Sequence, residues 1–278
     1  MDTTTTTITL PRTPHLAVSV AGQGPLVLMV HGMGGDRHAW RAQVEALRHR
    51  YTAASVDLRG YGDSGDIEGE LDFHRDFGAD LLAVLDHFQV PRAHLVGLSM
   101  GSRVVRSLAL RHPARVASLV LANSSPGFDA MPPDEVERFI ADRSAAFQGG
   151  QVPASFGRDQ ARAMCAPDAA PEALRTAAEA MQRIRLKNYL AVLVASTRQD
   201  RGDRLEQIAC PTLVITSDQD RVYPEPVTRP LLERIPAVAH ARIERAGHLS
   251  NLEQPEAFNQ AVLAFLRNMP AEAPARIA

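Results

Sequence analysis

The segment Gly97-Leu98-Ser99-Met100-Gly101 has the residue types and spacing that can make a serine a nucleophile. An apolar run precedes it, and apolar residues at helical spacing follow it. A serine on a sharp strand-to-helix turn needs small neighbours, which the two glycines provide. Such a turn lifts the hydroxyl out of the sheet and points the positive end of the helix at a bound group. The segment therefore predicts acyl transfer at Ser99.

A nucleophilic serine also needs a base, an orienting acid and donors for an oxyanion, and the sequence offers His248 as the base. His248 follows Gly247 on a loop between the last expected strand and the last expected helix. A loop at the carboxyl edge of the sheet can bring its imidazole over Ser99. The chain order of serine, acid and histidine also fits this assignment.

The acid should stand in the loop after the strand expected at 212–216, where the sequence has Asp218 and Asp220. A carboxylate there would hold the imidazole in one tautomer and stabilise the imidazolium. We assign this role to Asp220, and expect Asp218 to cap the loop or the turn that follows. Asp203 is a weaker candidate because it precedes the strand.

Donors for the oxyanion are expected from two backbone positions. The run His31-Gly32-Met33-Gly34-Gly35 ends an apolar strand, and its glycines let the backbone turn sharply beside the nucleophile. The N–H groups of Met33 and Met100 then satisfy the rule of one donor from this loop and one directly after the nucleophile. We expect His31 to brace the loop and to take no part in the chemistry.

The elements that must position these residues alternate between strand and helix. Continuous apolar strands in such an alternation indicate a mostly parallel sheet covered by helices on both faces. The first strands precede any helix, which predicts an antiparallel edge. Strands are expected at 8–10, 16–20, 26–30, 53–57, 94–98, 118–122, 212–216 and 239–243, and helices at 37–47, 73–87, 99–111, 226–234 and 255–267.

The alternation stops between residues 126 and 201, where the sequence is helical with proline- and glycine-containing loops. We predict an α/β core at 1–125 and 202–278 and a helical cap inserted at 126–201. Ligands of open α/β sheets bind at the carboxyl ends of the strands, so the cap should roof the site there. Its arginines offer partners for a substrate carboxylate, namely Arg138, Arg158, Arg162 and Arg183.

Composition narrows the functional class of this chain of 278 residues. A net charge of −2 gives no basic face for nucleic acid or an anionic membrane. No apolar run is long enough to span a bilayer, and the first residues do not resemble a signal peptide. We therefore expect a cytoplasmic protein, a monomer or homodimer, that acts on a small molecule. Cys165 and Cys210 are expected to be free thiols.

Cofactor-dependent chemistry finds little support in the sequence. Lys187 is the only lysine and lies in a helical stretch, so neither a Schiff base nor a phosphate-binding P-loop is expected. No metal-binding or dinucleotide-binding motif stands in a suitable context. The prediction is a site without a cofactor or metal.

Taken together, the segments at 31–34, 57–64, 97–101, 217–220 and 247–248 resemble those of serine hydrolases of the α/β-hydrolase fold. The resemblance covers nearly the whole chain. It implies that Asp57, Arg59 and Ser64 brace loops, and it aligns the acid with Asp220. Some relatives carry the acid after the preceding strand, but Asn123 stands near that position. The chain departs from the usual pattern where Ser102 and Ser217 replace glycines.

The substrate is predicted from the same resemblance. The Gly-Leu-Ser-Met-Gly turn with a short helical cap is similar to 3-oxoadipate enol-lactonases and polyketide methyl esterases. Carbon–carbon bond hydrolases of this fold often have asparagine where Leu98 stands, which favours an ester or lactone. Epoxide hydrolases and haloalkane dehalogenases use an aspartate nucleophile, so Ser99 argues against both. Two alternatives stay open: cleavage of a vinylogous diketone, and a ligand-binding protein or non-hydrolytic catalyst.

Overall fold

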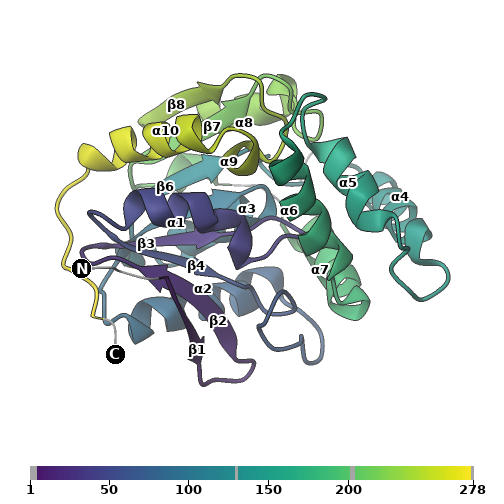
Figure 1. Ribbon diagram of the computed structural model, residues 1–278, viewed down its shortest axis with the longest axis horizontal. Coiled ribbons are helices and arrows are strands. Elements are labelled where there is room, and N and C mark those ends of the chain that lie inside the picture. Colours follow the sequence, from purple (N-terminus) through teal and green to yellow (C-terminus); the bar gives the residue numbers. More distant parts are fainter. Residues whose placement is uncertain (1–4, 129–130, 201–203, 277–278) are drawn as a thin grey trace.

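The computed structural model describes residues 5–128, 131–200 and 204–276, and within them an eight-stranded sheet forms the middle layer (Figure 1). The strand order is β1-β2-β4-β3-β5-β6-β7-β8. β2 runs antiparallel to β1 and β4, and all later pairings are parallel, which confirms the predicted antiparallel edge. The strands are β1 (Thr6–Leu10), β2 (Leu16–Ala21), β3 (Leu26–Val30), β4 (Thr52–Val56), β5 (Ala93–Leu98), β6 (Val116–Ala122), β7 (Thr212–Ser217) and β8 (Val238–Ile243).

Helices cover both faces of the sheet because its inner strands are apolar throughout. Every side chain of β3 is at most 1% exposed, so neither of its faces can meet water. One apolar cluster lies under α1, α9 and α10, and the other lies under α2, α3 and α8. No helix in the described ranges combines the length and apolarity that crossing a bilayer demands. The helices that cover the two faces of the sheet are α1 (Arg41–Leu47), α2 (Phe73–His87), α3 (Met100–Arg111), α8 (Glu225–Arg234), α9 (Ser250–Glu253) and α10 (Pro255–Arg267).

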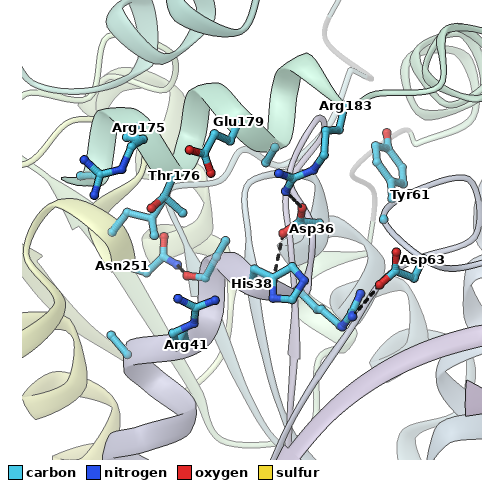
Figure 2. Close-up of a pocket in the computed structure, with 18 of the residues that line it drawn as sticks. Asp36, His38, Arg41, Tyr61, Asp63, Arg175, Thr176, Glu179, Arg183 and Asn251 are labelled. Atoms are coloured by element: carbon cyan, nitrogen blue, oxygen red, sulfur yellow. Dashed lines mark hydrogen bonds and ion pairs between the residues drawn. The ribbon is translucent and has the colours of Figure 1, made fainter. Parts of the chain in front are cut away.

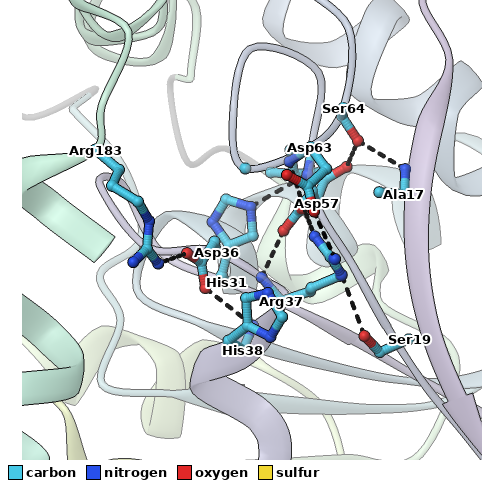
Figure 3. A network of polar contacts seen from close by, with 12 residues as sticks. Ala17, Ser19, His31, Asp36, Arg37, His38, Asp57, Asp63, Ser64 and Arg183 are labelled. Atoms are coloured by element: carbon cyan, nitrogen blue, oxygen red, sulfur yellow. Dashed lines mark hydrogen bonds and ion pairs between the residues drawn. The ribbon is translucent and has the colours of Figure 1, made fainter. Parts of the chain in front are cut away.

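The loops after β3 and β4 are tied together by a buried ion-pair network (Figure 3). Asp57 accepts hydrogen bonds from the backbone and guanidinium of Arg37, and the same guanidinium reaches Asp63 at 2.7 Å. Ser64 donates to the carbonyl of Asp57 at 2.7 Å and accepts from the N–H of Ala17 at 2.9 Å. The network anchors the start of the segment at 37–47. That segment forms a 3₁₀ turn at Arg37–Trp40 followed by α1, rather than the single helix predicted.

Between β6 and β7 the described residues form four α-helices, and we call them the helical insertion. Figure 1 shows them together at one side of the sheet, where α6 lies next to α9. An aromatic cluster of Phe147, Phe156 and Tyr189 holds them together, and Met33 of the core packs against it. Their bounds are α4 (Pro133–Ser144), α5 (Phe156–Met164), α6 (Pro171–Gln182) and α7 (Leu186–Gln199). The exact limits of a cap at 126–201 stay a prediction.

Candidate active site

Ser99 occupies a strained turn between β5 and α3. Its backbone has φ 54° and ψ −118°, a conformation that L-residues rarely adopt. A Cβ at Gly97 would lie 2.4 Å from the backbone nitrogen of Ser102, and one at Gly101 would lie 2.2 Å from the carbonyl oxygen of Val30. Only glycine fits at these close approaches, so the two glycines hold Ser99 at the N-terminus of α3.

His248 and Asp220 form a buried pair on the loops after β8 and β7. The imidazole Nδ1 lies 3.0 and 3.2 Å from the two carboxylate oxygens of Asp220. The side chains are only 3% and 1% exposed, so water does not screen the contact. Because the carboxylate accepts, the proton of a neutral imidazole resides on Nδ1, and Nε2 keeps a free lone pair.

Asp220 is held as an anion by further donors. The backbone N–H groups of Val222 and Tyr223 both donate to Oδ1 at 2.9 Å, and Asn123 Nδ2 donates to Oδ2 at 3.0 Å. Burial by itself would raise the pKa of Asp220, but the charge of His248 and these hydrogen bonds outweigh it and lower the pKa. Asn123 therefore supports the acid and does not replace it.

The other aspartates predicted as alternatives lie elsewhere. Asp218 accepts from the N–H of Ala246 at 3.2 Å, so it braces the turn that leads to His248 and makes no contact with the imidazole. Asp203 lies outside the described residues. The structure thus joins Asp220, and not Asp218, to His248.

The two expected oxyanion donors lie on either side of Ser99. Met33 and Met100 line the same cavity as Ser99 and His248. A Cβ at Gly32 would lie 3.1 Å from the Cβ of Ser99, so the loop after β3 runs directly against Ser99. Within the described residues, neither methionine N–H donates to another group. Both donors are therefore available to a bound oxygen.

The cavity that joins these residues has a volume of about 100 Å³ and lies between the core loops and the helical insertion. This volume is well below the roughly 300–1,000 Å³ typical of drug-sized ligand sites. Its walls are mainly aromatic and aliphatic, with a few polar side chains. The insertion contributes Phe139, Arg143, Phe156, Gln160, Met164, Met181, Tyr189, Leu193, Ser196 and Thr197.

The four insertion arginines expected to meet a substrate carboxylate are absent from the described walls of this cavity. Arg183 instead pairs with Asp36 at 2.7 Å in a separate cavity of about 1,100 Å³ between α6 and the segment at 35–45 (Figure 2). The four were possible partners only, and the structure instead places two other arginines in the walls of this cavity. The arginines that line the cavity beside Ser99 are Arg143 and Arg103, and Arg103 lies on the core helix α3.

The loop that carries His248 is fixed by a residue that sequence reasoning missed. The carboxylate of Glu253 accepts from the N–H groups of Gly247 and Leu249 at 2.9 and 3.0 Å, on either side of His248. It also accepts from Ala166 of the helical insertion at 2.7 Å. Burial raises the pKa of Glu253, and these three hydrogen bonds offset only part of that effect. The sequence signal that could have identified Glu253 was an acidic residue shortly after His248.

Comparison with known proteins shows the family to which the chain belongs. The profile of the alpha/beta hydrolase fold family matches residues 25–255, so the chain belongs to that family. It is 28% identical over 257 residues to 3-oxoadipate enol-lactonase 2 of Acinetobacter baylyi, covering 87% of this chain and 89% of that protein. It is 33% identical over 267 residues to a 2-hydroxy-6-oxononadienedioate/2-hydroxy-6-oxononatrienedioate hydrolase of Burkholderia vietnamiensis, covering 91% and 90%.

Solved structures give the same fold. The chain superimposes on a malate-bound thermophilic esterase from Thermogutta terrifontis with a TM-score of 0.82 and 28% identity. The match covers 95% of this chain and 98% of the esterase. These relatives define a hydrolase superfamily, and within it they act on different bonds.

Proposed function

We propose that the protein is a cofactor-free serine hydrolase that cleaves a small-molecule ester or lactone through an acyl-enzyme on Ser99. The observation that carries the proposal is that His248, paired with Asp220, lines the same cavity as Ser99 on its strained turn. The names of an enol-lactonase and an esterase among the relatives support it. The helical insertion then acts as the cap that selects substrates.

The proposed reaction begins when Ser99 Oγ attacks the substrate carbonyl and His248 Nε2 takes the serine proton. The carbonyl oxygen becomes an oxyanion that accepts from the N–H groups of Met33 and Met100. The tetrahedral intermediate collapses: the C=O bond re-forms and the bond between the acyl carbon and the alcohol oxygen breaks. The imidazolium gives its proton to the departing alcohol oxygen. In a lactone that alcohol stays attached to the acyl group. A water then attacks the acyl carbon of the ester to Ser99 and gives one proton to His248. The bond from the acyl carbon to Ser99 Oγ breaks, the imidazolium returns its proton to Oγ, and the acid is released.

A second candidate reaction, carbon–carbon bond cleavage in a vinylogous diketone, is favoured by the identity of 33% to the Burkholderia enzyme. Leu98 argues against it, since this buried apolar side chain offers no hydrogen-bond donor beside the nucleophile. A panel of esters, lactones and vinylogous diketones separates the two reactions by which bond is hydrolysed. A protein that binds ligands without catalysis would turn over none of them.

Labelling with a fluorophosphonate probe tests the nucleophile without knowledge of the substrate. We expect mass spectrometry to find the phosphonate on Ser99, and Ser99→Ala to abolish labelling while the protein stays folded. Ser102→Ala is the matched control, because Ser102 is a buried serine on the same turn whose hydroxyl donates to the carbonyl of Gly97. If wild-type protein is not labelled, or if folded Ser99→Ala hydrolyses esters at a near-normal rate, the proposal is overturned.

A further inference from the structure

Arg103 lines the cavity that holds Ser99, although its side chain is only 3% exposed. It stands four residues after Ser99 on α3, and residues at this spacing lie on the same face of a helix. The rings of Phe128 and Phe73 lie 5.0 and 5.8 Å from its guanidinium carbon, and hold the planar group in one orientation. A fixed cation therefore forms part of an otherwise mainly apolar wall.

The charge of Arg103 is only partly balanced by protein groups. Asp200 is its ion-pair partner, at 3.1 Å, but the same carboxylate pairs with Arg106 at 2.7 Å. All three side chains are at most 4% exposed. Two buried cations thus share one anion, which leaves an excess positive charge in a place that water reaches poorly. Buried charge of this kind calls for a counter-ion.

The hydrogen-bonding capacity of Arg103 is also only partly used. Its Nη1 donates to the carbonyl of Ser196 at 3.3 Å and to Asp200 at 3.1 Å. Its Nε is buried without a partner, and in the described part of the chain its Nη2 donates to no protein group. A guanidinium offers five N–H donors in a flat fork that matches a carboxylate. Most of that fork is unoccupied by protein.

We infer that the substrate carries a carboxylate near its scissile carbonyl, and that Arg103 binds this carboxylate. This inference rests on the proposed function, because it places the carboxylate in the same cavity as Ser99. A short chain must join the two groups, since Arg103 lies one helical turn from the nucleophile and the cavity is small. Arg106 ties α3 to Asp200 just as Arg103 does, but it does not line the cavity among the described residues. It is therefore the matched control.

The test compares monomethyl glutarate with a neutral analogue in which an isopropyl group replaces the carboxylate. Wild-type protein should have the higher kcat/KM for the half-ester. Arg103→Gln should lower the half-ester to neutral ratio by about 10- to 100-fold, the range expected for losing a charged hydrogen-bond partner. Arg103→Lys should keep part of the preference, because it retains the charge and loses the fork. Arg106→Gln should lower the ratio far less than Arg103→Gln, because it leaves Asp200 to Arg103 alone but keeps the fork of Arg103 in the cavity. Equal losses on both substrates in Arg103→Gln would show a structural role only and overturn the inference.

Binding of glutarate to the inactive Ser99→Ala protein gives a readout that needs no turnover. Glutarate should raise the melting temperature of this protein and of its Arg106→Gln derivative, but not of its Arg103→Gln derivative. If Ser99 is labelled and neutral esters are cleaved without preference for the half-ester, the inference fails and the proposed function stands. If nothing is hydrolysed but glutarate binds through Arg103, the proposed function fails and the carboxylate site stands. No binding by wild type or Ser99→Ala overturns the site.

Discussion

Replacing Asp220 by asparagine changes one atom of the site and should reverse the protonation of His248. The asparagine oxygen belongs at the Oδ1 position, where the N–H groups of Val222 and Tyr223 both donate. Its NH₂ group then occupies the Oδ2 position and faces the imidazole Nδ1. A donor there stabilises the tautomer with its proton on Nε2. That nitrogen can no longer accept the proton of Ser99.

The magnitude follows from this geometry. The variant loses a charge-assisted contact at 3.0 Å between two buried side chains, and the imidazolium formed in the reaction loses its counter-ion. Loss of the orienting carboxylate at a serine–histidine pair reduces kcat by about 10⁴-fold, or about 5.5 kcal/mol in activation free energy. We expect a loss of about 10³- to 10⁴-fold here.

The rate of Ser99 phosphonylation by a fluorophosphonate measures this effect without a known substrate, and ester hydrolysis provides a second assay. Asp218→Asn is the control, because Asp218 accepts from backbone N–H groups of the turn before His248, such as that of Ala246, whereas the imidazole Nδ1 pairs with Asp220. It should change the rate by less than about threefold, as expected when one partly exposed hydrogen bond is altered. Circular dichroism would verify that both variants fold. A larger loss in Asp218→Asn, or a folded Asp220→Asn with near-normal rates, would refute the assignment of the acid.

Three further outcomes are expected. The pKa of Asp220 is lowered from 3.8, so its ionised form adds stability at higher pH, and this stability is lost as the pH falls through the folded-state pKa. In urea unfolding, the free energies of unfolding of wild type and Asp220→Asn should therefore converge in acid. Gly101→Ala should destabilise the protein by about 1–3 kcal/mol or more through backbone overlap, whereas Gly78→Ala, with open space around the new methyl group in α2, should stabilise it by about 0.5–1 kcal/mol in the same assay. Burial raises the pKa of Cys165 to about 12 and of Cys210 to about 11, so both should resist iodoacetamide at neutral pH until urea unfolds the chain.

The core of the fold was predictable because its strands carry their own signal. The run at 26–30 is apolar at every position, and such a run is stable only when it is buried on both faces. All the expected strands form. The turn at Ser99 was also predictable, because Gly97 and Gly101 stand where a Cβ would overlap backbone atoms. The loop between β7 and His248 was harder, because Asp218 and Asp220 look alike in sequence. Only three-dimensional contacts show which carboxylate faces the imidazole.

The substrate-facing side of the site was not predictable in the same way. Arginines on amphipathic helices look equivalent in sequence, and the structure directs Arg183 to Asp36 rather than to the cavity. Arg103 was overlooked because an arginine within an apolar helix pattern is usually assigned to the surface. Its burial depends on Asp200, which lies 97 residues away in the chain. Partners at such separations leave no local pattern.

The contacts between the helical insertion and the histidine loop limit how this protein can be recombined with its relatives. The N–H of His248 donates to the carbonyl of Met164 at 2.7 Å, and Glu253 binds Ala166 together with the backbone on both sides of His248. A chimaera that exchanges residues 126–201 for the helices of another hydrolase would therefore replace residues that hold the loop of His248 in position. A chimaera that exchanges the other insertion residues but retains residues 164–166 of this chain would keep these contacts. It could then change substrate selectivity while the position of His248 is preserved.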